Sequence, residues 1–515
     1  ASAAAAQVTV SGAVQYEDRT YDAAGFNGTT MRPVRQADVE LLDTGTSVAL
    51  GSTDETGSFS FSGVAASSSL QVRIYARRAG GKINAVVRNN AGASAIYTAL
   101  SASIDTSVTT SFGTIDLLQT GAGPAFNIFD CAVKCFQYLA SLQPSLPAVP
   151  PPMTVYWELN NANGTYFDNA ANGIFLLGLV SDPDQYDDDI ILHEMGHWVA
   201  FNFSRDDTLG GPHSVIDQLD PRTSWSEGWA HYWSAAVRRF FPAEYANPNL
   251  QVDNFGSGNS VFDIEAPSFP TLAVMATNEL AVATVLWHLI DGNTLSPLGS
   301  GSVYEPEIWS SVSVQIPLQI NITLEKFHSG LTVVDPAIMP TVSGSETTPG
   351  IFKEREIRYY PDDSDPNEST GTAAPLTLGP VGLVQRTFFT PGDDWYSVAA
   401  TPGLLSVQTL NLGDGGDTVL ELYDASGLTL LASNDHRSST DRSSFVETPV
   451  AANATFLVRV TRGGTVVQYG YYDLQAQVGP LPPPIPPHGA HHCGALGMDA
   501  VALLGLVRLL RRPRC

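Results

Sequence analysis

The chain has 515 residues, which is too long for one ordinary hydrophobic core and predicts three or four domains. It carries 26 Lys and Arg against 52 Asp and Glu, a formal net charge of −26, which argues against nucleic acid or an anionic lipid surface as the main partner. Only 15% of residues are charged, and small residues are abundant, as in extracellular β-domains. The opening letters "ASAAAAQV" fit a stretch that remains after a signal peptide has been removed, so we expect the protein to be exported.

Residues 1–120 are predicted to form a β-sandwich. Short runs such as "VTVSGAVQY", "ADVELLD", "GSFSFSGV" and "LQVRIYARR" alternate apolar and polar positions between turn residues. The stretches "PVRQADVELLD" and "STDETGSFSFSGV" resemble the carboxypeptidase regulatory-like, transthyretin-like sandwiches. That resemblance implies an accessory or binding module rather than a catalytic one.

Residues 121–345 have a mixed α+β pattern. "MTVYWEL" and "GIFLLGLV" are predicted strands, and the predicted helices include "DIILHEMGHWVAFNF", "SEGWAHYWSAAVRRFF" and "NELAVATVLWHLID". In the helical stretch "FDCAVKCFQYL", Cys131 and Cys135 are four residues apart. A relaxed helix holds such β-carbons too far apart for easy bridging, so two buried thiols are favoured over a disulfide.

The helix "DDDIILHEMGHWVAF" carries a metal-binding pattern. His193 and His197 lie four residues apart, on one helix face, where two imidazoles form a clamp for zinc, Zn2+. Glu194 is rotated by about 100° from His193, so it reaches a water beside the metal more easily than the metal itself. We therefore predict Glu194 as the general base. The alternative is an amphipathic core helix whose histidines find other hydrogen bonds.

A third ligand is expected from "WSEGWAHYW", where Glu227 is predicted near the start of a second helix. "HEMGH" followed by "SEGWA" resembles the gluzincin metallopeptidases. The resemblance implies that His193, His197 and Glu227 bind zinc and that Glu194 is the base. The letters after His197, "WVAFNF", lack the extended metzincin pattern.

The group that stabilises the oxyanion is left open by the sequence. His231 follows Glu227 by four residues, shares its helix face, and is predicted either to orient a ligand or to act in catalysis. Other candidates for the oxyanion donor are His213, His288, Tyr166, Tyr232 and Tyr304. The edge strand expected beside the zinc helix is assigned to "GIFLLGLV", and it could hold an extended substrate by β-augmentation.

Residues 346–478 return to a strand pattern. "GDDWYSVAATPG", "GDTVLELYDASGLTLLASND" and "ATFLVRV" resemble the bacterial pre-peptidase C-terminal domain, a small β-sandwich attached to secreted peptidases. Its acidic loops suggest structural calcium, Ca2+, without specific ligands here.

The C-terminal end is predicted to be a spacer and a tail. Residues 479–492, "GPLPPPIPPHGAHH", form a stiff Pro-rich linker. Residues 493–515 combine Cys493, a short apolar stretch and an Arg cluster, and resemble the tripartite sorting tags of Gram-negative surface proteins. This resemblance implies anchoring at the cell surface or outer membrane, and the alternatives are a membrane anchor or a disordered end.

The fold class expected is multidomain, with an α+β zincin-like catalytic domain between two all-β sandwiches. The function expected is an exported zinc endopeptidase acting on protein or peptide substrates. The alternative is a catalytically silent surface adhesion protein that keeps a zinc site, and a zinc hydrolase of a non-peptide substrate also fits the ligands.

Overall fold

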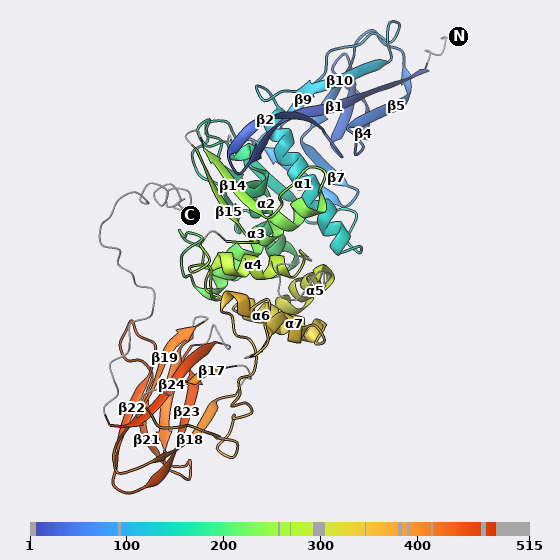
Figure 1. Cartoon of the computed structure of the whole chain (residues 1–515). Coiled ribbons are helices and arrows are strands. Elements are labelled where there is room, and N and C mark those ends of the chain that lie inside the picture. The colour runs from blue at the N-terminus through green and yellow to red at the C-terminus, as the bar shows by residue number, and fades with distance from the viewer. Residues whose placement is uncertain are drawn as a thin grey trace. The chain divides into compact units, whose positions relative to one another are not determined.

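The computed structural model describes residues 7–90, 94–255, 258–267, 269–291, 304–345, 347–379, 384–388, 392–413, 416–464 and 470–479. Figure 1 shows the elements along the chain. The chain divides into two compact units: Ala1–Phe203 with Trp229–Ser268, and Ser204–Gly228 with the described part of Phe269–Leu504. The division falls inside one continuous helix, α3 (Pro221–Phe240). The predictions for the Pro-rich linker beyond Gly479 and for the sorting tail lie outside the described residues.

The first unit begins with the predicted β-sandwich, which consists of two four-stranded sheets. One sheet contains β10 (Ser111–Leu117), β1 (Gln7–Asp22), β2 (Gly25–Pro33) and β5 (Ser58–Ala65). The other has the order β4 (Thr46–Ser52), β3 (Asp38–Asp43), β6 (Leu70–Tyr75) and β9 (Thr98–Leu100). Inward side chains such as Val39, Leu41 and Ile74 are buried, as the alternating pattern requires.

A five-stranded mixed sheet follows in the same unit. Its order is β12 (Tyr166–Asp168), β13 (Gly173–Leu176), β11 (Met153–Trp157), β8 (Ile83–Arg88) and β7 (Arg77–Gly80). Strands β8, β11 and β13 are parallel, and the two edge strands β7 and β12 run antiparallel to their neighbours. The helices α1 (Gly123–Leu142) and α2 (Asp188–Phe203) pack against this sheet and each other, with the short 3-10 turn Asp184–Tyr186 before α2.

Two sequence-based assignments are corrected by this sheet. The predicted boundary at residue 120 is crossed, because β8, from within residues 1–120, pairs with β11. The predicted edge strand "GIFLLGLV" is also wrong, since β13 lies inside the sheet and β12 forms the edge. Periodicity reports that a strand is half buried but not which strand it pairs with.

Helix α3 also differs from its prediction. It begins at Pro221 rather than beside Ser226, so Glu227 lies in its second turn instead of at its start. Pro221 is well suited to the first helical position because it has no N–H to leave unpaired. The hairpin of β14 (Leu250–Phe255) and β15 (Gly258–Asp263) follows, and β14 packs against α2.

The second unit continues with short helices. They are α4 (Glu279–His288), α5 (Glu305–Ser310), the π-helical turn Ser311–Gln315, the 3-10 turn Ile316–Leu318, α6 (Leu324–Val334), α7 (Met339–Ser343) and the 3-10 turn Lys353–Arg355. Buried aromatic residues fill the space between them, including Trp225 stacked on Phe327 with ring centroids 5.2 Å apart. None of the helices in the described part of the chain is long and apolar enough to cross a membrane.

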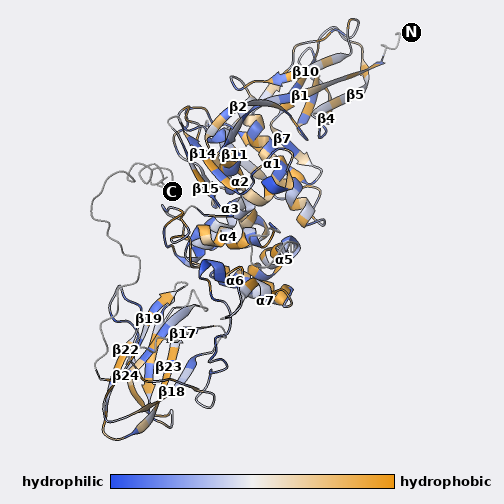
Figure 2. Ribbon diagram, viewed as in Figure 1, coloured by the Kyte–Doolittle hydropathy of each residue, from blue (hydrophilic) through white to orange (hydrophobic). Residues whose placement is uncertain are grey.

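The second unit ends in the predicted C-terminal β-sandwich. One sheet has the order β16 (Ala374–Pro375), β18 (Asp394–Ala400), β23 (Ala454–Arg462), β20 (Thr418–Tyr423) and β21 (Leu430–Asn434). The other has the order β17 (Val384–Thr387), β24 (Tyr471–Val478), β19 (Gly403–Gly413) and β22 (Phe445–Val450). Figure 2 shows apolar residues interleaved with polar ones along these strands. The apolar faces enclose a core that includes Tyr396, Val407 and Leu420.

Candidate metal centre

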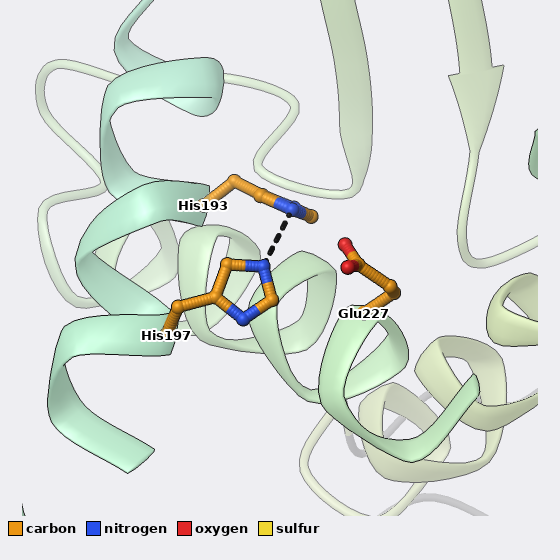
Figure 3. A group of neighbouring side chains, drawn as sticks. All are labelled: His193, His197 and Glu227. Carbon is orange, nitrogen blue, oxygen red and sulfur yellow. Dashed lines mark hydrogen bonds between the residues drawn. The ribbon is translucent and has the colours of Figure 1, made fainter. Parts of the chain in front are cut away.

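Three buried side chains from two helices gather at one point. His193 and His197 project from α2, and Glu227 projects from α3, with its carboxylate directed toward the two rings (Figure 3). Their ligand atoms all lie within 4.8 Å of one another, and the residues are 8%, 5% and 0% exposed, respectively. The sequence-predicted ligands are therefore brought together.

Two glycines allow α3 to pack closely on its neighbours, Gly196 at the contact with α2 and Gly228 at the contact with α4. A Cβ on Gly196, inside "HEMGH", would lie 2.9 Å from the Cα of Ala230 on α3. A Cβ on Gly228, beside Glu227, would lie 2.5 Å from the side chain of Val282 on α4. The Nε1–H of Trp229 also donates to the Gly196 carbonyl at 3.1 Å. Because α3 is continuous, this packing of its second half on α2 also fixes Glu227, two residues earlier.

The donor atoms fit a tetrahedral zinc ion. The Nε2 atoms of His193 and His197 are 3.2 Å apart. Zinc bonds of about 2.0–2.1 Å at a tetrahedral angle separate two nitrogens by about 3.3 Å. Two imidazoles and one carboxylate are also the usual protein ligands of a catalytic zinc site, which keeps a fourth position open. The residues therefore fit the ion that the sequence pattern predicts.

Glu194 is placed beside these ligands on α2. Its side chain is 3% exposed, and its Oε2 atom is buried without a hydrogen-bond partner in the described structure. An unpaired buried carboxylate oxygen is costly unless a ligand or water meets it. The predicted general base thus has a free acceptor atom at the site.

His231 touches a predicted ligand, His193. Its Nδ1 lies 3.2 Å from the Nδ1 of His193, and its ring packs edge-on against Phe262 with centroids 5.0 Å apart. This contact occupies the outer nitrogen of His193 and leaves Nε2 directed toward the metal position. The sequence left two roles open for His231, orienting a ligand or acting in catalysis. Its contact with His193 favours the first role.

The aspartates at the start of α2 tie that helix to its neighbours. Asp187 accepts from the backbone N–H of Asn254 at 2.9 Å, and Asp189 accepts from that of Val252, both on β14. Burial raises the pKa of Asp187, and the nearby Asp253 raises it further. Burial likewise raises the pKa of Asp189, to about 6. The sequence placed these acids at a helix start, and the structure adds their backbone partners.

Asp188 belongs to a buried ionic network. Burial acts to raise its pKa, but the Lys134 ammonium and hydrogen bonds from Tyr245 and Asn127 hold it below its usual value. Lys134 is fully buried and lies 3.1 Å from Asp130 and 3.0 Å from Glu244. Arg35, from the N-terminal sandwich, reaches the same two acids at 2.8 and 2.7 Å.

The two cysteines of α1 are free thiols. Cys131 is buried and donates to Asp188 at 3.2 Å, and Cys135 is also buried and free, so the disulfide alternative is excluded.

The other predicted candidates fall in different places. Tyr232 is buried against Trp229, and Tyr166 stacks on Phe175 with centroids 5.1 Å apart. His288 lies 3.3 Å from Glu354, and Tyr304 precedes α5. His213 is placed beside a predicted ligand, with its Nε2 3.5 Å from Glu227.

One residue of this region was missed from the sequence. Glu279, in the first turn of α4, is fully buried and lies 3.2 Å from the Nε2 of His213. An acid there usually interacts with the helix dipole in solvent. The available signal was its position before the apolar run "LAVATVLW", interrupted only by Thr284, which predicts burial of the whole first turn.

Comparison with known proteins links this part of the chain to peptidases. Residues 146–294 match the family described as the Mycolysin C-terminal domain, which is a peptidase-associated domain. The matched range covers less than a third of the chain but contains α2, α3 and α4, and with them His193, Glu194, His197, His213, Glu227, His231 and Glu279. No curated protein matches the chain.

Two solved structures resemble parts of the chain. The pre-peptidase C-terminal domain of a collagenase from Bacillus anthracis is 14% identical, with a TM-score of 0.17, and the match covers 20% of this chain and 94% of that one. The periplasmic inhibitor of g-type lysozyme from Aeromonas hydrophila is 12% identical, with a TM-score of 0.16, and covers 20% and 96%. By its own elements the chain is multidomain, with sheets and helices, and residues 146–294 match a peptidase-associated domain.

Proposed function

We propose that the chain is a secreted, zinc-dependent endopeptidase that hydrolyses protein or peptide substrates. The observation that carries this proposal is the convergence of the ligand atoms of His193, His197 and Glu227 within 4.8 Å, with Glu194 next to His193 along α2. The match of residues 146–294 to a peptidase-associated domain supports the same reaction class.

Each side chain has a distinct role in this proposal. The Nε2 atoms of His193 and His197 and one oxygen of Glu227 hold the ion. When bound, zinc supplies a Lewis acid that polarises the scissile carbonyl and lowers the pKa of a coordinated water to about 7. Glu194 accepts the proton of the attacking water through its unpaired Oε2 and passes it to the leaving amine. His231 positions the ring of His193 through their contact of 3.2 Å.

The edge strand β12 offers a way to hold an extended substrate. It is three residues long, ends the sheet order, and contacts α2. The backbone of an edge strand can pair with a peptide, and an extended peptide paired there would run beside the helix that carries Glu194. We assign this role to β12 instead of "GIFLLGLV", because β12 is the edge strand and β13 lies inside the sheet.

The test compares the intact chain with the variant Glu194→Gln. We expect one zinc per chain in both, and we expect Glu194→Gln to lower the rate of protein hydrolysis by about 10²–10⁴-fold, the usual contribution of a general base. A chelator should abolish hydrolysis by the intact chain. The matched control is Glu447→Gln, an exposed acid on β22.

Two results would contradict the proposal. Equal turnover by Glu194→Gln and the intact chain would remove Glu194 as the base. A zinc-loaded chain that binds proteins without cleaving any would instead favour the silent adhesion protein.

A further inference from the structure

A second group of buried side chains meets Glu227 within the second unit. His213, in the loop before α3, has its Nε2 3.5 Å from Glu227 and 3.2 Å from Glu279. The side chains of these three residues are 8%, 1% and 0% exposed. The imidazole therefore lies between two carboxylates that are both removed from water.

The loop that carries His213 is fastened to the start of α4. The Nδ2 atom of Asn278, which caps this helix, donates to the carbonyls of Val215 at 2.8 Å and Asp217 at 3.2 Å. The backbone N–H of Leu219 donates to the Thr277 carbonyl at 2.7 Å. The position of His213 is thus set by backbone contacts, independently of its own ring.

The hydrogen bonds of the ring define which atom faces the acids. The Nδ1 of His213 lies 3.0 Å from the Gly211 carbonyl, which can only accept, so Nδ1 donates to it. Nε2 is then the ring atom that faces the two acids, 3.2 Å from Glu279 and 3.5 Å from Glu227, and when it carries a proton it can donate toward them. A donor in this place fixes a carboxylate in one orientation and offsets the repulsion between the two acids.

Close packing brings the second acid to this position. A Cβ on Gly228 would lie 2.7 Å from the Glu279 carbonyl and 2.5 Å from Val282, so α3 and α4 meet closely at the residue after Glu227. Outer partners that hydrogen-bond to a metal-binding carboxylate orient it and raise the affinity for the ion.

We propose that His213, held by Gly211 and Glu279, is a positioning residue that orients the Glu227 carboxylate for zinc. This inference rests on the proposed function, because it assumes that Glu227 binds the metal. It assigns to His213 a role that acts through Glu227, in place of the oxyanion contact considered from sequence. It also gives Glu279 a task at the metal centre.

The test measures zinc affinity by chelator competition and the visible spectrum of the cobalt-substituted chain, neither of which depends on hydrolysis. We expect His213→Ala to weaken zinc binding by about 10–100-fold and to shift the cobalt bands. His213→Gln, whose amide can donate near the place of Nε2, should recover most of the affinity. Glu279→Gln should weaken binding less than His213→Ala.

The matched control is His328→Gln in the same unit. His328 is buried and contacts the Ser343 hydroxyl at 2.7 Å. This substitution should alter stability but not zinc affinity or the cobalt spectrum.

Several outcomes would overturn the inference. They are unchanged affinity and spectrum in His213→Ala, an equal loss in His328→Gln, and a second zinc in the intact chain that Glu279→Gln removes. An intact chain that binds zinc tightly and loses affinity in His213→Ala but hydrolyses no protein would sink the proposed peptidase activity while leaving this inference standing.

Discussion

The two β-sandwiches resemble each other in sequence pattern but differ in how they are joined to the rest of their units. The N-terminal sandwich contributes Arg35 to the buried charges of α1, and its strand β1 contributes Tyr16, whose hydroxyl donates to Asp130 at 2.9 Å. The C-terminal sandwich encloses a core made of its own residues, from Ala374 to Ala476. We infer that the first is an integral part of its unit, whereas the second is a self-contained module.

The largest expected effect comes from truncation. Removing residues 1–120 deletes β7 and β8 from the five-stranded sheet and leaves Asp130 and Glu244 without Arg35. We expect no folded, zinc-binding chain. Ending the chain at residue 361 should preserve one zinc and protein hydrolysis, measured by metal analysis and a proteolysis assay. If both truncated chains bound zinc and hydrolysed protein equally well, the proposed difference between the two sandwiches would be contradicted.

A smaller effect is expected from single charges. Lys134→Met leaves Asp130, Asp188 and Glu244 without their shared buried cation, and should cost about 3–5 kcal/mol of unfolding free energy. Arg459→Met, on β23 of the C-terminal sandwich, breaks a pair with Asp393 whose side chains are 31% and 34% exposed. It should cost no more than about 1 kcal/mol. Urea unfolding measures both, and similar losses would argue against the distinction.

The smallest effect concerns pH. Burial, with the charge of Asp188, raises the pKa of Asp18 from 3.8 to about 7. Between these values the folded state binds more protons than the unfolded state, so ionising Asp18 lowers stability as pH rises from about 4 to 7. Asp18→Asn should therefore gain stability relative to the intact chain between pH 5 and pH 8, on the order of 1–3 kcal/mol.

The control for this pH effect lies in the C-terminal sandwich. A hydrogen bond from Ser426 lowers the pKa of the exposed Asp424 to about 2, so its contribution is lost only as pH falls below about 4. Asp424→Asn should show no relative change between pH 5 and pH 8. A matching change in both variants would rule out burial of Asp18 as the cause.

The sequence predicted which residues converge at the candidate metal centre better than it predicted their surroundings. His193 and His197 could be predicted from the sequence because residues four apart share one face of a helix. Glu279 could not be predicted, because its contact with His213 joins a loop to a helix that begins 66 positions later. Asp130 and Lys134 form an ordinary i,i+4 pattern, which on a solvent-facing helix is a weak pair, and only the packing of β1 over α1 buries them.

The strands show the same limit. The alternation of buried and half-buried residues in β8 is the same whether the strand belongs to a sandwich or to the sheet beside α2, so the pattern predicted a strand and not its partners. Gly196 and Gly228 carry no periodic signal. Their role is visible only once α2, α3 and α4 are packed together.

The most direct test of the account is anomalous diffraction at the zinc edge from crystals of the full chain grown with zinc. We predict one strong peak within about 2.0–2.2 Å of the Nε2 atoms of His193 and His197 and of one Glu227 oxygen, with no fourth protein ligand. A peak held instead by His213, Glu227 and Glu279, or a Glu227 carboxylate turned away from the ion, would contradict the account.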